Sequence, residues 1–217
     1  MKLEQALLSR RSIRRYLQIP VEREKWVKML HAAQCAPSSG NLQNWKFIIV
    51  TDQKKRLALA HDCHDQMWMS QAPLHIVVLA DTQIAHQYYH VRGERLYTVQ
   101  NCAAAIQNML LQATQLKLAT CWVSSFEEHH VREHLSIPDH LRPQAIITVG
   151  YPDEIVPAPA KKKLKDITFF EEYGVRRTKE QEALERMNYA DFFDAKISKV
   201  GEVWQGFLTR LKELFSR

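Results

Sequence analysis

Two clusters of basic side chains stand far apart in the sequence and could bind a phosphate group. The first is a run of arginines and the second a run of lysines: Arg10, Arg11, Arg14 and Arg15, then Lys161, Lys162, Lys163 and Lys165. Arginine binds phosphate through its planar fork of N–H groups, and lysine binds it as a point charge. Convergence of both clusters on one phosphate is one interpretation, and two solvated charge runs are the other.

A polar loop between a predicted helix and a predicted strand could bind the edge of a heterocycle. Its sequence is Pro37-Ser-Ser-Gly-Asn-Leu-Gln-Asn-Trp45. Asparagine and glutamine offer both donors and acceptors, which suits a ring with alternating carbonyl and N–H groups. Gly40 would allow a ligand to approach the backbone closely. The alternative is a turn that ends a helix and whose Asn side chains satisfy the backbone.

Histidines and neighbouring metal-binding side chains also occur, but their spacing does not favour a metal centre. His61, Cys63, His64 and Asp65 would point around the circumference of a helix. His130 and His134 have the i, i+4 spacing but lack an HExxH arrangement. We therefore expect surface histidines and no metal.

Hydrophobic periodicity predicts the elements that position these groups. Apolar residues recur at three and four positions, or alternate with turn residues at strand length, in a mixed order that indicates an α+β or α/β protein. The predicted helices cover residues 2–9, 21–36, 53–65, 97–118 and 127–135, and the predicted strands cover 45–51, 75–80, 120–123 and 144–150, the last ending at a Gly-Tyr-Pro turn. The helix over 97–118 is expected to be central and largely buried.

Composition narrows the class of protein and of partner. The chain has 217 residues, 46% hydrophobic and 25% charged, with a net charge of +6, which is neither a polycation nor an acidic disordered chain. We expect a small anionic ligand rather than nucleic acid, because no zinc-finger spacing, RNP-type aromatic run or basic helix is present. No export signal and no apolar run of membrane-spanning length is found, so a cytoplasmic protein without membrane spans is expected.

The four cysteines fit the same compartment. Cys35, Cys63, Cys102 and Cys121 form no CxxC pair, which favours reduced thiols. Cys35 and Cys121 precede the polar loop and another polar segment, and we expect both to be buried structural thiols.

The C-terminal part differs from the rest in composition. Prolines and lysines predict an extended arm over 157–165, and an apolar stripe from Val200 to Phe215 predicts an amphipathic helix. We expect a main domain over 1–178 and a helical extension over 179–217. The extension could pack on its own domain, wrap a partner subunit or lie on a membrane, and wrapping a partner is the preferred interpretation.

Five segments together carry a resemblance to a known family. They are Arg10-Arg-Ser-Ile-Arg14, Ala36-Pro-Ser-Ser-Gly-Asn-Leu-Gln-Asn-Trp45, Ala103-Ala-Ala-Ile-Gln-Asn-Met-Leu-Leu111, Cys121-Trp-Val-Ser-Ser-Phe126 and Val149-Gly-Tyr-Pro152. In this order, over about residues 4–168, the chain resembles the nitroreductase family of FMN-dependent oxidoreductases.

The resemblance implies a fold, an assembly and a set of cofactor-binding residues. It implies an α+β, nitroreductase-like fold with a central, mostly antiparallel sheet flanked by helices, in an interlocked homodimer with FMN at the subunit interface. The matching residues are Arg10, Arg11, Ser12 and Arg14, with Lys161 and Lys163, for the phosphate and ribityl chain, Ser38, Ser39, Asn41 and Gln43 for the loop at the flavin, and Ser124 and Ser125 for backbone contacts near N5. Asn41 is the preferred ring contact, and the loop could come from the partner subunit or from the same one.

The same resemblance implies a reaction. NADH or NADPH would deliver hydride through flavin N5 to an electron-poor acceptor, such as a nitroaromatic or a quinone, by a ping-pong mechanism with no catalytic side chain. The alternatives are an FMN-binding or sensing protein with little turnover, and a family member that acts on flavin itself or on a halogenated aromatic.

Two positions depart from the family pattern. Asn44 stands where the family loop usually has proline, and Asn101 stands where the long helix usually begins with an acidic residue. We expect the first departure to change the backbone of the loop and the second to change how the substrate is bound.

Overall fold

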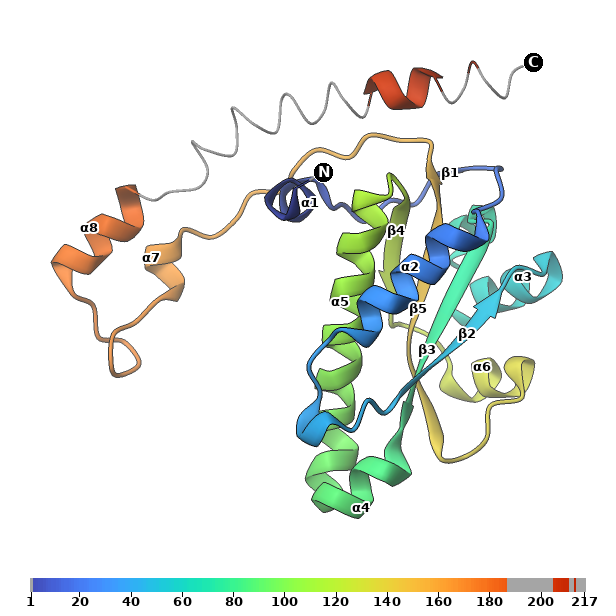
Figure 1. Ribbon diagram of the computed structural model, residues 1–217, viewed down its shortest axis with the longest axis horizontal. Helices are drawn as coiled ribbons and strands as arrows, with labels where there is room; N and C mark the ends of the chain where they lie inside the picture. The colour runs from blue at the N-terminus through green and yellow to red at the C-terminus, as the bar shows by residue number, and fades with distance from the viewer. Residues whose placement is uncertain (1, 187–204, 211–212, 214–217) are drawn as a thin grey trace. The chain divides into compact units, whose positions relative to one another are not determined.

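An antiparallel sheet of five strands forms the centre of residues 1–156 in the computed structural model (Figure 1). The structure describes residues 2–186, 205–210 and 213. The chain divides into two compact units, Met1–Val156 and Pro157–Arg217. The predicted site residues are distributed over both units, with only the lysines in the second.

The sheet has strand order β1-β5-β3-β2, with β4 also paired to β5, and all strand pairs are antiparallel. Its strands are β1 (Tyr16–Leu17), β2 (Trp45–Val50), β3 (Leu74–Asp81), β4 (Ala119–Val123) and β5 (Leu141–Pro152). β3 is buried at all eight positions, as expected for a strand covered on both faces. The predicted mostly antiparallel sheet is confirmed.

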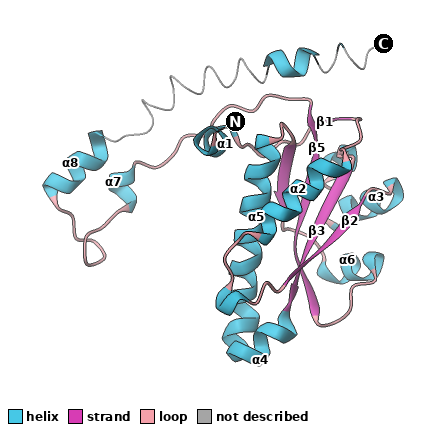
Figure 2. Cartoon of the chain, viewed as in Figure 1, coloured by secondary structure: helices cyan, strands magenta, loops and turns pink. Residues whose placement is uncertain are grey.

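Helices cover both faces of the sheet (Figure 2). The helices of the first unit are α1 (Leu3–Ser9), α2 (Arg23–Gln34), α3 (Gln53–Asp62), α4 (Thr82–Arg92), α5 (Thr98–Gln115) and α6 (Glu128–Leu135), with short turns η1 (Ser39–Asn41), η2 (Met67–Gln71) and η3 (Gly93–Tyr97). α2 and α5 pack together on one face, and α3 and α6 on the other.

Alternation along the strands explains this layering. Val77 and Leu79 of β3 join one core cluster with Leu59 of α3 and Val131 of α6. Successive strand side chains point to opposite faces, so the intervening residues of β3 are directed towards α5. The long helix α5 buries half of its positions, which confirms the prediction of a central, largely buried helix.

The structure corrects the predicted end of the last strand. The Gly-Tyr-Pro segment is the last part of β5 and not a turn, because β5 continues to pair with β1 through Pro152. Gly150 serves close packing there: a Cβ would lie 2.7 Å from Pro73 Cδ and 2.8 Å from Tyr16 Cδ1.

Sequence patterns also missed α4 and the π-helical turn η3 that joins it to α5. Asp81 caps α4 by accepting a hydrogen bond from Ile84 N at 3.1 Å. His90, inside α4, has φ 49° and ψ −146°, a strained conformation for a residue with a Cβ. Ala85 is the only buried residue of α4, so the helix has no apolar stripe by which it could be recognised in the sequence.

The second unit contains α7 (Leu164–Ile167) and α8 (Thr178–Arg186). Residues 157–163 have no regular secondary structure, as predicted for an extended arm, but the last two residues of the predicted arm, 164 and 165, belong to α7. Residues 205–210 are helical, but most of the predicted amphipathic stripe lies outside the described residues. Within the part of the chain that the structure describes, no helix is both long and apolar enough to cross a membrane.

Candidate functional site

The segment from Arg10 to Arg14 is an extended connection between α1 and β1 that runs beside β4. Ser12 forms a parallel bridge with Thr120, and Ile13 N donates to Thr120 O at 3.0 Å. The buried Ile13 side chain anchors the segment in a small apolar cluster. Alternation then leaves Arg10, Ser12 and Arg14 less buried than Ile13.

The arginines of this segment differ in what they contact. Arg11 Nη1 donates to the carbonyls of Leu8 and Arg10 at 2.7 and 2.8 Å, which satisfies the C-terminal end of α1. Its Nε is buried and has no hydrogen-bond partner. Burial, with the charge of Arg10 beside it, lowers the pKa of Arg11. The Arg14 guanidinium lies 5.6 Å from the centre of the Trp68 ring.

A carboxylate fixes the backbone of the same segment. Glu154 Oε1 accepts hydrogen bonds from the N–H groups of Arg14 and Arg15, at 2.6 and 3.1 Å. This bond ties the basic segment to the residues that follow β5. The side chains of Arg10, Arg11 and Arg14 form no salt bridge with any residue that the structure describes. Their charge is therefore available to an anion.

The predicted polar loop forms the 3₁₀ turn η1 and an irregular return to β2. Asn41 and Gln43 are exposed, and Gln43 Nε2 donates to Asn41 Oδ1 at 3.1 Å. Gly40, Asn41 and Gln43 all have positive φ, at 53°, 56° and 47°. Left-handed backbone costs a residue with a Cβ roughly 1–2 kcal/mol, so contacts with other elements must hold the loop in this conformation.

Asn101 of α5 provides such contacts. Its Oδ1 accepts from Ser39 N at 3.0 Å, and its Nδ2 donates to Ser39 Oγ at 3.0 Å and to Asn44 Oδ1 at 2.8 Å. Asn44 Nδ2 in turn donates to the carbonyl of Asp81, at the end of β3, at 3.1 Å. The two departures from the family pattern are thus in direct contact. The sequence analysis identified Asn44 and Asn101 as two separate departures, and the tertiary structure shows that their side chains are in contact.

Tyr89 of α4 is a further neighbour of the loop that the sequence analysis missed. A Cβ at position 40 would collide with the Tyr89 hydroxyl, so Gly40 allows α4 to approach the loop. The Tyr89 ring packs edge-on against Tyr97, with 5.2 Å between ring centres. Because α4 itself was not predicted, no sequence signal pointed to this contact.

The basic segment and the polar loop lie at opposite ends of α5 (Figure 1). Asn101, in the first turns of the helix, holds the loop, whereas Ser12 pairs with Thr120 beyond the other end. A helix rises 1.5 Å per residue, so Asn101 and Gln115 are about 20 Å apart along the axis. One chain therefore presents the two halves of the predicted site at well-separated positions.

The two remaining parts of the predicted site are the serines that follow β4 and the lysines that precede α7. Ser124 and Ser125 are exposed and directly follow β4, the strand beside the basic segment. Lys161 and Lys163 are exposed residues of the second unit, before α7. The arginines belong to the first unit, and the convergence of the two clusters stays a prediction.

The sequence of this chain matches a family model described as "Nitroreductase family" over residues 7–84 and 64–151. The chain belongs to the nitroreductase family. A Thermus thermophilus protein named NADH dehydrogenase is 32% identical over 176 residues, covering 69% of this chain and 86% of that protein. A Bacillus subtilis protein named FMN reductase [NAD(P)H] is 27% identical over 160 residues, covering 68% of this chain and 64% of that protein.

Solved structures agree with this membership. An FMN-dependent nitroreductase from Clostridium difficile has a TM-score of 0.67 and 31% sequence identity, and the match covers 78% of this chain and 99% of that one. The nitroreductase-like α+β fold expected from the resemblance is confirmed. As a member of the nitroreductase family, the protein is an oxidoreductase by class.

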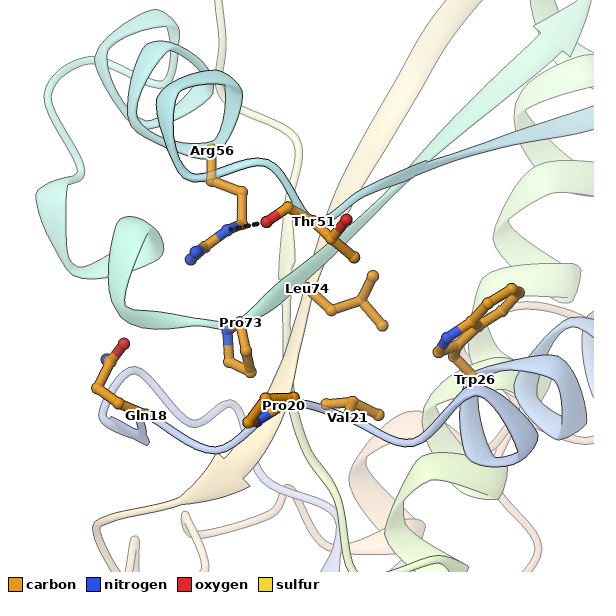
Figure 3. Close-up of a pocket in the computed structure, with 8 residues that line it drawn as sticks. All are labelled: Gln18, Pro20, Val21, Trp26, Thr51, Arg56, Pro73 and Leu74. Carbon is orange, nitrogen blue, oxygen red and sulfur yellow. Dashed lines mark hydrogen bonds between the residues drawn. The ribbon is translucent and has the colours of Figure 1, made fainter.

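A pocket of about 330 Å³ in this nitroreductase-family chain contains none of the predicted site residues (Figure 3). It lies between the β1–α2 connection, the end of β2 and the start of β3, with Trp26 and Arg56 on opposite sides. The Arg56 guanidinium donates to the carbonyls of Thr51, Ser70 and Ala72. Its hydrogen bonds thus join α3 to the neighbouring chain segments, which is a structural role.

The histidines expected on the surface also have structural contacts. His134 Nδ1 lies 2.7 Å from Asp62 Oδ2, and His130 Nδ1 lies 3.9 Å from Asp62 Oδ1. These pairs join α6 to the end of α3. His61 Nδ1 lies 2.7 Å from Asp65 Oδ1. Among the described residues, no group of three or more His, Cys, Asp or Glu side chains could hold a metal.

The cysteines are free thiols, and one of them corrects an expectation. Cys63, Cys102 and Cys121 are buried, and burial raises the pKa of each thiol, to about 12 for Cys63 and Cys102. Cys35, expected to be buried, is exposed. It is the C-cap residue of α2, and its position lies off the helix face that buries Met29 and Ala33.

Proposed function

We propose that the protein is an FMN-dependent oxidoreductase that transfers hydride from NADH or NADPH to an electron-poor acceptor, such as a nitroaromatic or a quinone. Membership of the nitroreductase family supports this proposal, as do the relatives named for FMN reduction and for FMN-dependent nitroreduction. The observation that carries it is the arginine segment beside β4, in which the side chains of Arg10, Arg11 and Arg14 form no salt bridge with any described residue.

The arginine segment fits the phosphate of FMN. A phosphate dianion would compensate the charges of Arg10, Arg11 and Arg14. Arg11 is partly buried and would contribute its positive charge to this site. Ser12, between them, offers a hydroxyl, and Lys161 and Lys163 are the proposed additional cations.

The polar loop and the end of β4 fit a flavin ring. Asn41 and Gln43 present exposed amides, and Ser38 and Ser39 complete the polar lining. Amide donors near N1 and the C2 carbonyl would stabilise negative charge in that region. Ser124 and Ser125 would provide backbone contacts near N5. When bound, FMN would supply the hydride transfer between nicotinamide and acceptor at N5.

We further propose a homodimer in which each FMN is held by the basic segment of one subunit and the polar loop of the other. The separation of these segments along α5 supports this arrangement. Leu3 and Leu7 of α1 are 68% and 55% exposed, so the chain presents apolar surface near the basic segment. Exposed apolar surface of this kind is suited to contact with a partner subunit.

The first test is spectroscopic and then kinetic. We expect purified protein to show absorbance bands near about 370 and 450 nm and to release roughly one FMN per subunit on heating. NADH or NADPH should bleach the 450 nm band without oxygen, and a nitroaromatic or quinone should restore it. A protein that binds FMN but transfers no electrons would instead support the FMN-binding alternative. Failure to bind FMN would overturn the proposal.

A further inference from the structure

We propose that Asn101 is a positioning residue for the flavin-binding loop, and that Asn101 and Asn44 act as a matched pair in which both side chains must be amides. This inference rests on the proposed function. Asn101 and Asn44 are buried residues, 5% and 1% exposed, so neither is available to touch a ligand. Asn101 therefore acts through the loop residues that it holds.

Backbone groups determine the orientation of both amides. Ser39 N can only donate, so the atom of Asn101 that faces it must be Oδ1. The carbonyl of Asp81 can only accept, so the atom of Asn44 that faces it must be Nδ2. Asn44 Oδ1 then faces Asn101, whose Nδ2 is the donor that this oxygen requires.

This arrangement distinguishes an amide from a carboxylate of the same shape. A carboxylate at position 101 could still accept from Ser39 N, and the Ser39 hydroxyl could rotate to donate to it. It would, however, place an oxygen against Asn44 Oδ1. Asn44 could not relieve this by flipping, because its oxygen would then face the Asp81 carbonyl. Buried polar atoms left without partners, or facing like partners, are strongly unfavourable.

The hydrogen bonds of Asn101 reach both ends of the loop. Ser39 lies at the start of the loop and Asn44 at its end, and the three left-handed residues lie between them. Asn44 is also anchored through its backbone, because Asp81 N donates to Asn44 O at 2.7 Å. Loss of the Asn101 amide would therefore release a strained loop at one end and weaken its hold at the other, and the exposed amides of Asn41 and Gln43 would shift.

The test compares Asn101→Asp with Asn108→Asp in the full-length protein. Asn108 is a matched control because it lies two turns later on α5 and its Nδ2 donates to the Ala32 carbonyl at 3.1 Å, away from the loop. FMN dissociation constants are measured from pH 5 to 9 by flavin fluorescence. The ratio of each variant to wild type removes the titration of FMN itself.

We expect Asn101→Asp to lose affinity as the pH rises, by about tenfold or more relative to wild type at pH 9. At low pH the introduced carboxyl is protonated, its O–H can donate to Asn44 Oδ1, and affinity should return towards the wild-type value. The two-electron midpoint potential of FMN bound to Asn101→Asp should also fall at high pH, because the shifted loop amides would stabilise the negative charge of reduced flavin less. If the preference for reduced over oxidised flavin is tenfold weaker than in wild type, the potential falls by about 30 mV. Asn108→Asp should stay within about threefold of wild type across the range.

Two outcomes of the FMN-binding measurements would overturn the inference. The first is an Asn101→Asp affinity within twofold of wild type at every pH, and the second is an equal loss in Asn108→Asp. Asn44→Ala, Asn101→Ala and the double variant are measured without FMN, by denaturant unfolding. Additive losses of stability in these apoproteins would show that the two amides are not coupled and would also overturn it. If wild type itself binds no FMN, the proposed function fails, whereas the unfolding cycle still decides whether the pair is coupled.

Discussion

Three of the four arginines in the α1–β1 connection have side chains without a salt bridge to any described residue. The Arg15 guanidinium lies 3.9 Å from Asp153, whereas the guanidinium groups of Arg10, Arg11 and Arg14 form no salt bridge with any described residue. Uncompensated cations on one short segment are suited to a ligand that carries two negative charges. At the scale of residues, positive charge and hydrogen-bond donors define the proposed phosphate site.

Removing one cation of the proposed phosphate site, either an arginine or a lysine, should weaken FMN binding without unfolding the protein. We expect Arg10→Ala and Lys163→Ala each to cost about 1.5–3 kcal/mol of FMN binding free energy, because each removes a charged hydrogen bond. Equilibrium dialysis measures this. Arg15→Ala is the matched control, since Arg15 is exposed and paired with Asp153. Unchanged FMN retention in both site variants would refute the phosphate site.

His75 should make the stability of the fold depend on pH. Burial lowers the pKa of His75 to about 4, and its Nε2 lies 2.9 Å from the Met69 carbonyl. The unfolded chain binds this proton near pH 6.5, so the stabilisation is complete above that pH and is lost as the pH falls towards 4. The contribution of His75 should fall by about 2 kcal/mol between pH 7 and pH 5.

Urea unfolding of wild type and His75→Gln at these two pH values checks the expectation. Glutamine keeps an N–H donor but does not titrate, so the variant should show a smaller loss between pH 7 and pH 5. Identical losses in both proteins would show that His75 does not titrate as inferred.

At the scale of elements, α4 and the π-helical turn η3 form the neighbourhood of the polar loop. Gly93, where η3 begins, packs against α4 so closely that a Cβ would collide with the Ala85 carbonyl and lie 2.6 Å from Tyr89 Cβ. Backbone atoms cannot move aside as the end of a side chain can. The position of Tyr89 beside Gly40 therefore depends on a glycine at 93.

Gly93→Ala should destabilise the protein by about 1–3 kcal/mol, because it overpacks this contact. The usual effect inside a helix is the opposite, since alanine is favoured over glycine. Thermal unfolding measures the change, with Gly206→Ala as control because nothing lies within 4 Å of a Cβ there. Stabilisation by both substitutions would contradict the packing argument.

At the scale of the whole molecule, the two halves of the proposed site lie at opposite ends of α5, and a second subunit would complete each half. Mixing defective subunits tests this. One variant carries Arg10→Glu, and the other carries Asn41→Ala with Gln43→Ala. Each alone should bind little FMN.

Unfolding and refolding the two variants together should restore part of the binding. Random pairing makes about half of the dimers mixed, each with one complete site, so about a quarter of all sites should bind FMN. A mixture of Arg10→Glu and Arg14→Glu is the control, since no pairing of these variants yields a complete basic segment. If the first mixture binds no more FMN than its components, each site is built from one chain.

The local sequence was sufficient to predict several helices and strands and the family of this protein. The periods of α2, α3 and α5 and the β-branched runs of β2 and β3 were readable because each element buries one face, or both, against a core. The family, and through it the residues of the proposed cofactor site, followed from five motifs in order. The extension over 179–217 stays a prediction, since most of its helix lies outside the described residues.

Tertiary structure alone decided the rest, because it depends on contacts between distant parts of the chain. α4 buries only Ala85 and is held by close packing at Gly93, so its sequence shows no apolar stripe. The contact between Asn44 and Asn101 joins residues 57 positions apart. No local propensity encodes that contact, since a buried amide gains its stability from the one partner that the fold brings opposite it.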